Sequence, residues 1–199
     1  MILKSAFSPL SSQKRIIIEM GSLIIKHDQM KQRLAGAMGK DIVKCICHYY
    51  YPHTRKMPDY ALISHMFSEV TIRERNDKQT NRFGGEKPDH YRFDAVLAVK
   101  PGRDAINQNS VFTVGIELKG TIEDLRADKK FTHYRGWTNL LFFAVPKALV
   151  AVAEEKVEFY DDIGVIDIEN GFVCKYPRMC TVPLNTEVEL LKQLLYNYM

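Results

Sequence analysis

The chain has no long hydrophobic run. Its longest continuous apolar stretch covers residues 140–146 of a 199-residue sequence, whereas a membrane-spanning helix needs about 20 predominantly apolar residues. The first residues also lack the apolar segment and small-residue cleavage site of a secretory signal peptide. These two absences predict a cytoplasmic protein that neither crosses nor enters a membrane.

Cysteine is scarce as well, with 4 in the whole sequence. No two of them form a CxxC pair, and none stands at zinc-site spacing from a histidine, which argues against a structural zinc site. His48 and His53 lack the HExxH pattern of a zinc protease, and Gly84-Gly85 lacks the spacing of a phosphate-binding or dinucleotide-binding loop. We therefore expect reduced, mostly buried thiols and no nucleotide-binding motif.

The sequence does contain enough apolar residues for one sizeable core. Hydrophobic residues make up 46% of the chain and charged residues 26%, which is ordinary for a globular protein and argues against disorder. Lys and Arg total 28 against 24 for Asp and Glu, so the formal net charge is +4. This mild excess of positive charge is compatible with a polyanionic partner without requiring one.

Hydrophobic periodicity predicts the order of the helices and strands. Apolar residues at helical spacing favour helices at about 11–34, 41–50, 60–66, 123–132 and 146–155, and a last one with Thr186 and Glu189 as its capping box. Alternating or continuously apolar residues favour strands at about 68–73, 91–100, 111–119, 140–145 and 164–168. The order predicts an α/β fold with a central mixed sheet flanked by helices. Residues 1–58 form an N-terminal helical segment in this interpretation, and residues 59–199 form the main domain.

Charged residues interrupt two of the predicted strands. Asp94 lies within the otherwise apolar segment 93–97, and Glu117 and Lys119 end the strand 111–119. Residues two apart in a strand share a face, so Glu117 and Lys119 lie about 7 Å apart on one face at a rise of ~3.3 Å per residue. If the strand 91–100 pairs with this one as an antiparallel hairpin, Asp94 joins them at one end of the sheet.

Two converging carboxylates suit a hard cation such as Mg²⁺, and the carbonyl of Leu118 offers a further oxygen ligand. Such a metal polarises a phosphate and lowers the pKa of a bound water, while Lys119 orients that water or stabilises charge on the phosphate. The alternatives are a solvated Glu–Lys pair at a strand edge and a core ion pair with no metal. The apolar surroundings favour the metal site, because burying carboxylates without partners is costly.

A second motif follows the predicted site. Residues 124–134 read DLRADKKFTHY, and residues 141–146 read LFFAVP. Together with RFDAV at 92–96 and ELK at 117–119, they resemble the MmcB-like DNA repair family, which belongs to the PD-(D/E)XK nuclease superfamily. Thr138-Asn139 departs from the Cys-Asp that the family carries before its apolar strand.

The resemblance extends from about Glu69 to about Gly171, with Phe131 in place of the family's tryptophan. It implies a restriction-endonuclease-like core and a metal site in which Asp94 and Glu117 are completed by a glutamate upstream. Glu69 matches that position best, and Glu74 and Glu19 are the alternatives.

Basic residues gather beside the predicted site, where phosphate contacts are expected. Those expected to contact nucleic acid are Arg92, Lys130, Arg73 and Arg82, and Arg75, Lys78 and Lys87 belong to the same group. Asp128 and Lys130 lie on the predicted helix after the site and either support it or contact DNA. The alternative for all of them is a set of solvated charges.

The combined prediction is a DNA endonuclease or repair-type nuclease that hydrolyses phosphodiester bonds with Mg²⁺ or Mn²⁺. Its catalytic residues are Asp94, Glu117, Lys119 and Glu69, and its metal ligands are Asp94, Glu117, Leu118 and Glu69. The competing hypothesis is a non-catalytic nucleic-acid-binding or assembly module that keeps the nuclease fold. A homodimer is among the expected states, because nucleases of this superfamily often pair to cut both strands.

Overall fold

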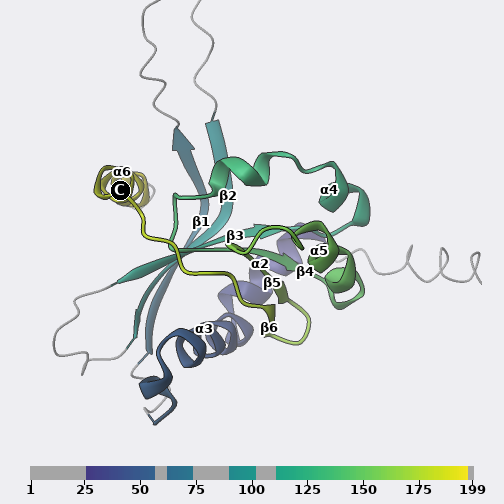
Figure 1. Ribbon diagram of the computed structural model, residues 1–199, viewed down its shortest axis with the longest axis horizontal. Coiled ribbons are helices and arrows are strands. Elements are labelled where there is room, and N and C mark those ends of the chain that lie inside the picture. Colours follow the sequence, from purple (N-terminus) through teal and green to yellow (C-terminus); the bar gives the residue numbers. More distant parts are fainter. Residues whose placement is uncertain (1–25, 57–61, 74–89, 102–110, 197–199) are drawn as a thin grey trace, which may run out of the picture.

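A computed structural model describes residues 26–56, 62–73, 90–101 and 111–196 (Figure 1). A six-stranded sheet forms its centre, and the spatial order of the strands is their order in the chain. The strands are β1 (Leu62–Arg73), β2 (His90–Pro101), β3 (Phe112–Leu118), β4 (Leu140–Val145), β5 (Ile163–Asp167) and β6 (Phe172–Lys175).

The pairing of neighbouring strands changes from antiparallel to parallel and back to antiparallel across the sheet. The first three strands form an antiparallel meander, β4 and β5 then run parallel to β3, and β6 is antiparallel to β5. Parallel neighbours need a crossover connection, which here contains α4 (Ile122–Ala127) and η3 (Lys130–Tyr134) between β3 and β4, and η4 (Lys147–Leu149) and α5 (Val150–Lys156) between β4 and β5. The carboxyl ends of β3, β4 and β5 therefore meet at one edge.

Helices cover both faces of the sheet. On one face, α2 (His27–Ala35) and α3 (Ala37–Tyr50) contribute buried side chains such as Met30 and Ile46 to a core shared with β2, β3 and β4. On the other face, α4, η3, α5 and α6 (Leu184–Tyr196) share a second core with the same sheet. Because β4 faces a core on both sides, all its residues are buried, which explains its continuous apolar sequence.

These layers confirm the predicted α/β class, with a central mixed sheet flanked by helices, and they are consistent with a restriction-endonuclease-like core. The antiparallel pairing of β2 with β3 is also confirmed. The N-terminal helices α2 and α3 pack into a core of the sheet, while residues 1–25 lie outside the described part of the chain. Within that part, no helix combines the length and apolar character that crossing a bilayer requires.

Three predictions of local structure are wrong. The helix expected at 60–66 is the start of β1, because Leu62 to Met66 pair with the distal half of β2 in a long hairpin. The helix expected at 123–132 ends at Ala127, and Asp128 has extended backbone angles. The last helix begins at Leu184 and so contains Thr186 instead of being capped by it. Strand β6 was not predicted, since its four residues carry no clear alternation.

One irregularity of the sheet lies at Glu69 and Asp94. Along β1, Met66 contacts the core beneath α2 and α3, whereas Val70 and Ile72 belong to the opposite core. Along β2, Phe93 and Ala95 likewise belong to opposite cores, although residues two apart in a regular strand share a face. Glu69 has a φ of 56°, the one positive φ of a non-glycine residue in the described ranges. In both strands, the side chains that point to one core before this position therefore point to the other core after it.

Candidate active site

The carboxyl end of β3 carries the first two predicted site residues into the protein interior. Glu117 is 4% exposed and Lys119 is 8% exposed, and Lys119 Nζ lies 3.6 Å from Glu117 Oε2. The backbone N–H of Lys119 donates to the carbonyl of Ala144 at 3.1 Å. This bond extends the pairing of β3 with β4 by one residue and fixes the point at which Lys119 leaves the sheet.

Asp94 joins this end of β3 through a side-chain hydrogen bond. Regular pairing of β2 with β3 reaches Ala95 and Ile116, and beyond that pair the N–H of Leu118 donates to Asp94 Oδ2 at 2.8 Å. A carboxylate oxygen thus takes the place of a backbone carbonyl where the two strands separate. The structure brings Asp94, Glu117 and Lys119 together, as the sequence pattern predicts.

The electrostatics of Glu117 are unusual for a glutamate. Burial and the neighbouring Asp94 carboxylate raise its pKa from 4.5 to about 8, against the smaller opposing effect of Lys119. Glu117 Oε1 is buried and accepts no hydrogen bond from any residue in the described ranges. A buried polar atom without a donor costs free energy, so this oxygen is suited to an additional ligand.

Lys119 is held by carboxylates on the helical connection that follows it. Its Nζ lies 2.8 Å from Asp128 Oδ2 and 3.9 Å from Asp124 Oδ1. Burial alone would lower the pKa of Lys119, but the hydrogen bond with Asp128 and the nearby negative charges outweigh burial and raise it. Lys119 is therefore held in its protonated form.

Asp128 supports the site from the end of α4. Its Oδ1 accepts a 2.8 Å hydrogen bond from the N–H of Lys130, and its backbone carbonyl accepts one of 2.7 Å from Lys156 Nζ. Between the two roles left open for Asp128 by the sequence, the geometry favours support of Lys119. Lys130 itself is exposed and has its backbone in η3.

Glu69 takes part in a different set of contacts. Its side chain is 49% exposed and pairs with Lys31 and, at 3.7 Å, with Arg92. The hydrogen bond from Lys31 is the main cause that lowers the pKa of Glu69, and the charges of Lys31 and Arg92 add to it. The pairing of β1 with β2 places Glu69 beside Asp94. The described partners of Glu69, however, are the basic side chains of Lys31 and Arg92 at the rim of the site.

Two residues of α2 complete the surroundings and were missed from the sequence. His27 Nε2 lies 3.1 Å from Asp94 Oδ1, and Lys31 forms the pair with Glu69. Residues four apart lie on the same face of a helix, so α2 contacts the irregular point of the sheet through both side chains. No local sequence pattern marks either residue, because both contacts depend on how α2 packs against the sheet.

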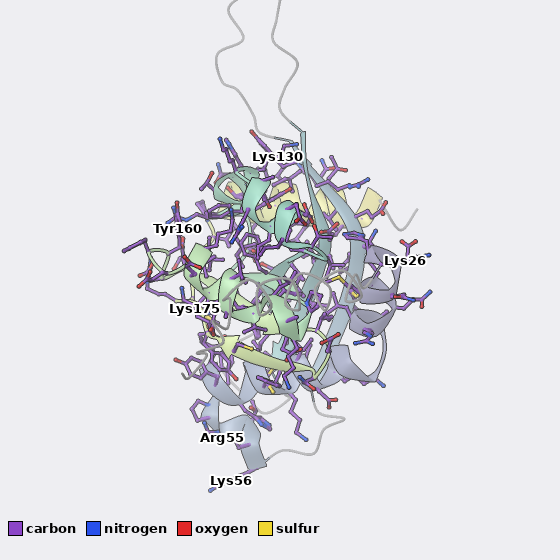
Figure 2. The ribbon with its side chains drawn as sticks, turned by 90° about the vertical axis from the view of Figure 1, so that its right-hand side faces the viewer. Lys26, Arg55, Lys56, Lys130, Tyr160 and Lys175 are labelled. Atoms are coloured by element: carbon purple, nitrogen blue, oxygen red, sulfur yellow. The ribbon has the colours of Figure 1, made fainter. Side chains whose placement is uncertain are left out.

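The other predicted contact residues are only partly described. Arg92 is exposed, and Figure 2 shows Lys130 at the end of the molecule opposite Arg55 and Lys56. The predictions that fall outside the described backbone or side chains concern Glu19, His53, Arg73, Glu74, Arg75, Lys78, Arg82 and Lys87.

The donor set fits a hard divalent cation better than a softer metal. In the described part of the chain, no group of three or more His, Cys, Asp or Glu side chains is arranged to hold a metal ion. Zinc sites generally need at least three protein ligands, whereas Mg²⁺ commonly uses one or two carboxylates and keeps several waters. Asp94 and Glu117, with the unpartnered Oε1 atom, satisfy this smaller requirement.

Comparison with known proteins finds one family model that matches part of the chain. The family model described as "DNA repair protein MmcB-like" matches residues 97–178. The matched segment contains Glu117, Lys119 and Asp128, and it begins after Asp94 and Glu69. The match supports the predicted resemblance to the MmcB-like family over this segment, which is less than half of the chain.

No curated protein matches the chain. A solved structure described as "SPO1766 protein of unknown function from Silicibacter pomeroyi" is similar to this chain with 15% sequence identity and a TM-score of 0.43, and the similarity covers 73% of this chain and 80% of that chain.

Proposed function

We propose that the chain is a divalent-cation-dependent nuclease that hydrolyses phosphodiester bonds of DNA in repair. The observation that carries this proposal is the buried carboxyl of Glu117, whose Oε1 has no donor among the described residues. Beside Asp94 its pKa is raised to about 8, so the site disfavours a second negative charge until a cation is present. The family match over residues 97–178 supports DNA as the substrate.

Each residue of the site has a role in this proposal. Asp94 and Glu117 would hold Mg²⁺ or Mn²⁺, the Leu118 carbonyl would be a further ligand, and Glu69 remains the proposed upstream glutamate. The bound cation would polarise the scissile phosphate and lower the pKa of a water. Lys119 is kept protonated by Asp128. This favours stabilisation of charge on the phosphate by Lys119 over removal of a proton from the water.

The experiment is a nicking assay on supercoiled plasmid with Mg²⁺ or Mn²⁺. Wild type should nick the plasmid and lose this activity in EDTA, and Asp94→Asn, Glu117→Gln and Lys119→Met should each lower the rate by about 100-fold or more. Asp161→Asn is the matched control, because Asp161 is an exposed aspartate paired with Arg178 on the surface. Equal cleavage by wild type and the three site variants would contradict the proposal.

A non-catalytic DNA-binding module is the second candidate. It is favoured by the close pairing of Lys119 with Asp128, at 2.8 Å, which keeps the lysine engaged within the chain. The two candidates differ in one outcome of a substrate screen with Mn²⁺ over single-stranded, duplex and branched DNA and RNA. Binding of DNA without cleavage of any substrate would support the module and exclude the nuclease.

A further inference from the structure

Helix α6 exposes an unusual amount of apolar surface. Half of the exposed large hydrophobic residues in the described ranges lie on this helix: Leu184 is 74% exposed, Val188 41%, Leu191 45% and Leu195 66%. Figure 1 shows α6 at the margin of the molecule, away from α4 and α5. Contiguous apolar surface of this kind usually marks an interaction site.

The exposed residues have the spacing of a helix-pairing seam. Their numbers advance by four, three and four, so all four lie on one face of an α-helix, as the a and d positions of a heptad do. The helix has a separate inner face, where Leu190 and Leu194 are buried against the sheet. The inner face already attaches α6 to its own domain. The four apolar residues of the outer face therefore remain exposed and can pack against another helix.

Charged residues flank the seam on its two sides. Glu187 precedes Val188 and Lys192 follows Leu191, which are the g and e positions when the exposed residues are a and d. In two parallel helices, the g residue of one helix meets the e residue of the next heptad of the other. Glu187 of one copy would therefore face Lys192 of a second copy, and Lys192 is exposed, with an internal partner, Glu189, 3.9 Å away.

We propose that the outer face of α6 is a self-association surface on which a second copy of this chain docks its own α6 in parallel. The seam of Leu184, Val188, Leu191 and Leu195 forms the apolar centre. Two symmetric Glu187–Lys192 pairs set the direction of the helices, because an isologous interface makes each contact twice. The proposal rests on the surface of α6 alone and holds whether or not the site cleaves DNA.

The first experiment measures the mass of the full chain in solution by sedimentation equilibrium over a wide range of protein concentration. Wild type should reach the mass of a dimer, and Leu191→Lys should raise the dissociation constant of the dimer by about tenfold or more, because it places a charge in the seam. Phe159→Lys is the matched control, since Phe159 is 89% exposed and lies outside α6. This variant should dimerise as wild type does.

The second experiment tests the direction of pairing and does not depend on the seam variant remaining folded. Glu187→Lys alone should weaken the dimer, because two lysines then face each other, and Lys192→Glu alone should weaken it through two glutamates. The double variant Glu187→Lys/Lys192→Glu should recover the wild-type dissociation constant. Recovery is a result that a structural role of either residue within one chain would not produce.

Four outcomes would overturn the proposal. These are a monomer at all concentrations, a dimer that resists Leu191→Lys, a dimer that Phe159→Lys disrupts equally, and a double charge reversal that does not recover. A monomer whose thermal stability falls with Leu191→Lys would instead assign the seam to another segment of the same chain.

Discussion

At the scale of single residues, the buried carboxyl of Glu117 makes the stability of the metal-free protein depend on pH. The unfolded chain releases this proton near the ordinary value of 4.5, while the folded chain holds it until about pH 8. The stabilising contribution is therefore complete below about pH 4.5 and is lost as the pH rises to about 8. We expect the free energy of unfolding, measured by urea denaturation in EDTA, to fall over this interval.

Glu117→Gln is the variant that isolates this effect. The amide keeps the shape of the side chain but cannot ionise, so the part of the pH dependence between about 4.5 and about 8 should disappear. Asp161→Asn should leave that part in place, because Asp161 is an exposed residue paired with Arg178. An unchanged pH dependence in Glu117→Gln would show that another group is responsible.

Gly164 gives a prediction about packing within the sheet. A Cβ atom there would lie 2.5 Å from the Phe142 ring and 2.6 Å from the carbonyl oxygen of Lys175. Because a backbone carbonyl cannot rotate away, Gly164→Ala should lower the free energy of unfolding by about 1–3 kcal/mol. Gly36→Ala is the control, since the nearest atom to its Cβ would be the carbonyl oxygen of Gln32, at 3.4 Å. Chemical denaturation of both variants checks the difference.

At the scale of secondary structure, the short helix α4 depends on its first residue. Thr121 accepts a hydrogen bond at Oγ1 from the N–H of Asp124, at 3.1 Å, and the helix leads to Asp128, which holds Lys119. Thr121→Ala should therefore reduce the free energy of unfolding by about 1 kcal/mol, and Thr121→Ser should retain most of it. Thr132→Ala is the control, because Thr132 is exposed and its hydroxyl donates to Lys129 at 3.3 Å. A loss of equal size in the control would argue against a specific capping effect.

The elements that could be predicted from the sequence are those with a strong local pattern. β2, β3 and β4 are identified by alternation or by a continuous apolar run, and Asp94, Glu117 and Lys119 follow from their places in those strands. The first half of β1 was missed, because its strand character comes from pairing with the far half of β2. No local pattern predicts that His27 reaches Asp94, since that contact depends on how α2 packs across the sheet. The positive φ of Glu69 is likewise not predicted by any local pattern, and it lies between the pairs that Ser68 and Val70 form with β2.

At the scale of the whole molecule, the proposed contacts with DNA predict that basic residues at one end contribute to DNA binding and those at the other end do not. Lys130 lies at the opposite end from Arg55 and Lys56 (Figure 2). If DNA lies over the end with Lys130, Lys130→Ala should weaken binding and reduce the slope of log K against log salt by about 0.9. Lys56→Ala should change neither quantity. Fluorescence anisotropy at several salt concentrations measures both, and an equal effect of the two variants would indicate binding without a defined surface.

The hydrogen bond from Leu118 to Asp94 has a consequence for how such a chain changes over evolution. Asp94 closes the end of the β2–β3 pairing as well as facing Glu117, so its loss would impair folding whether or not the protein cuts DNA. Asparagine preserves an acceptor for that bond, whereas alanine does not. Relatives without catalytic activity should therefore still retain this aspartate or replace it by asparagine. Glu117 Oε1 forms no hydrogen bond within the described fold. Conservation of Glu117 would therefore distinguish active from inactive relatives better than conservation of Asp94.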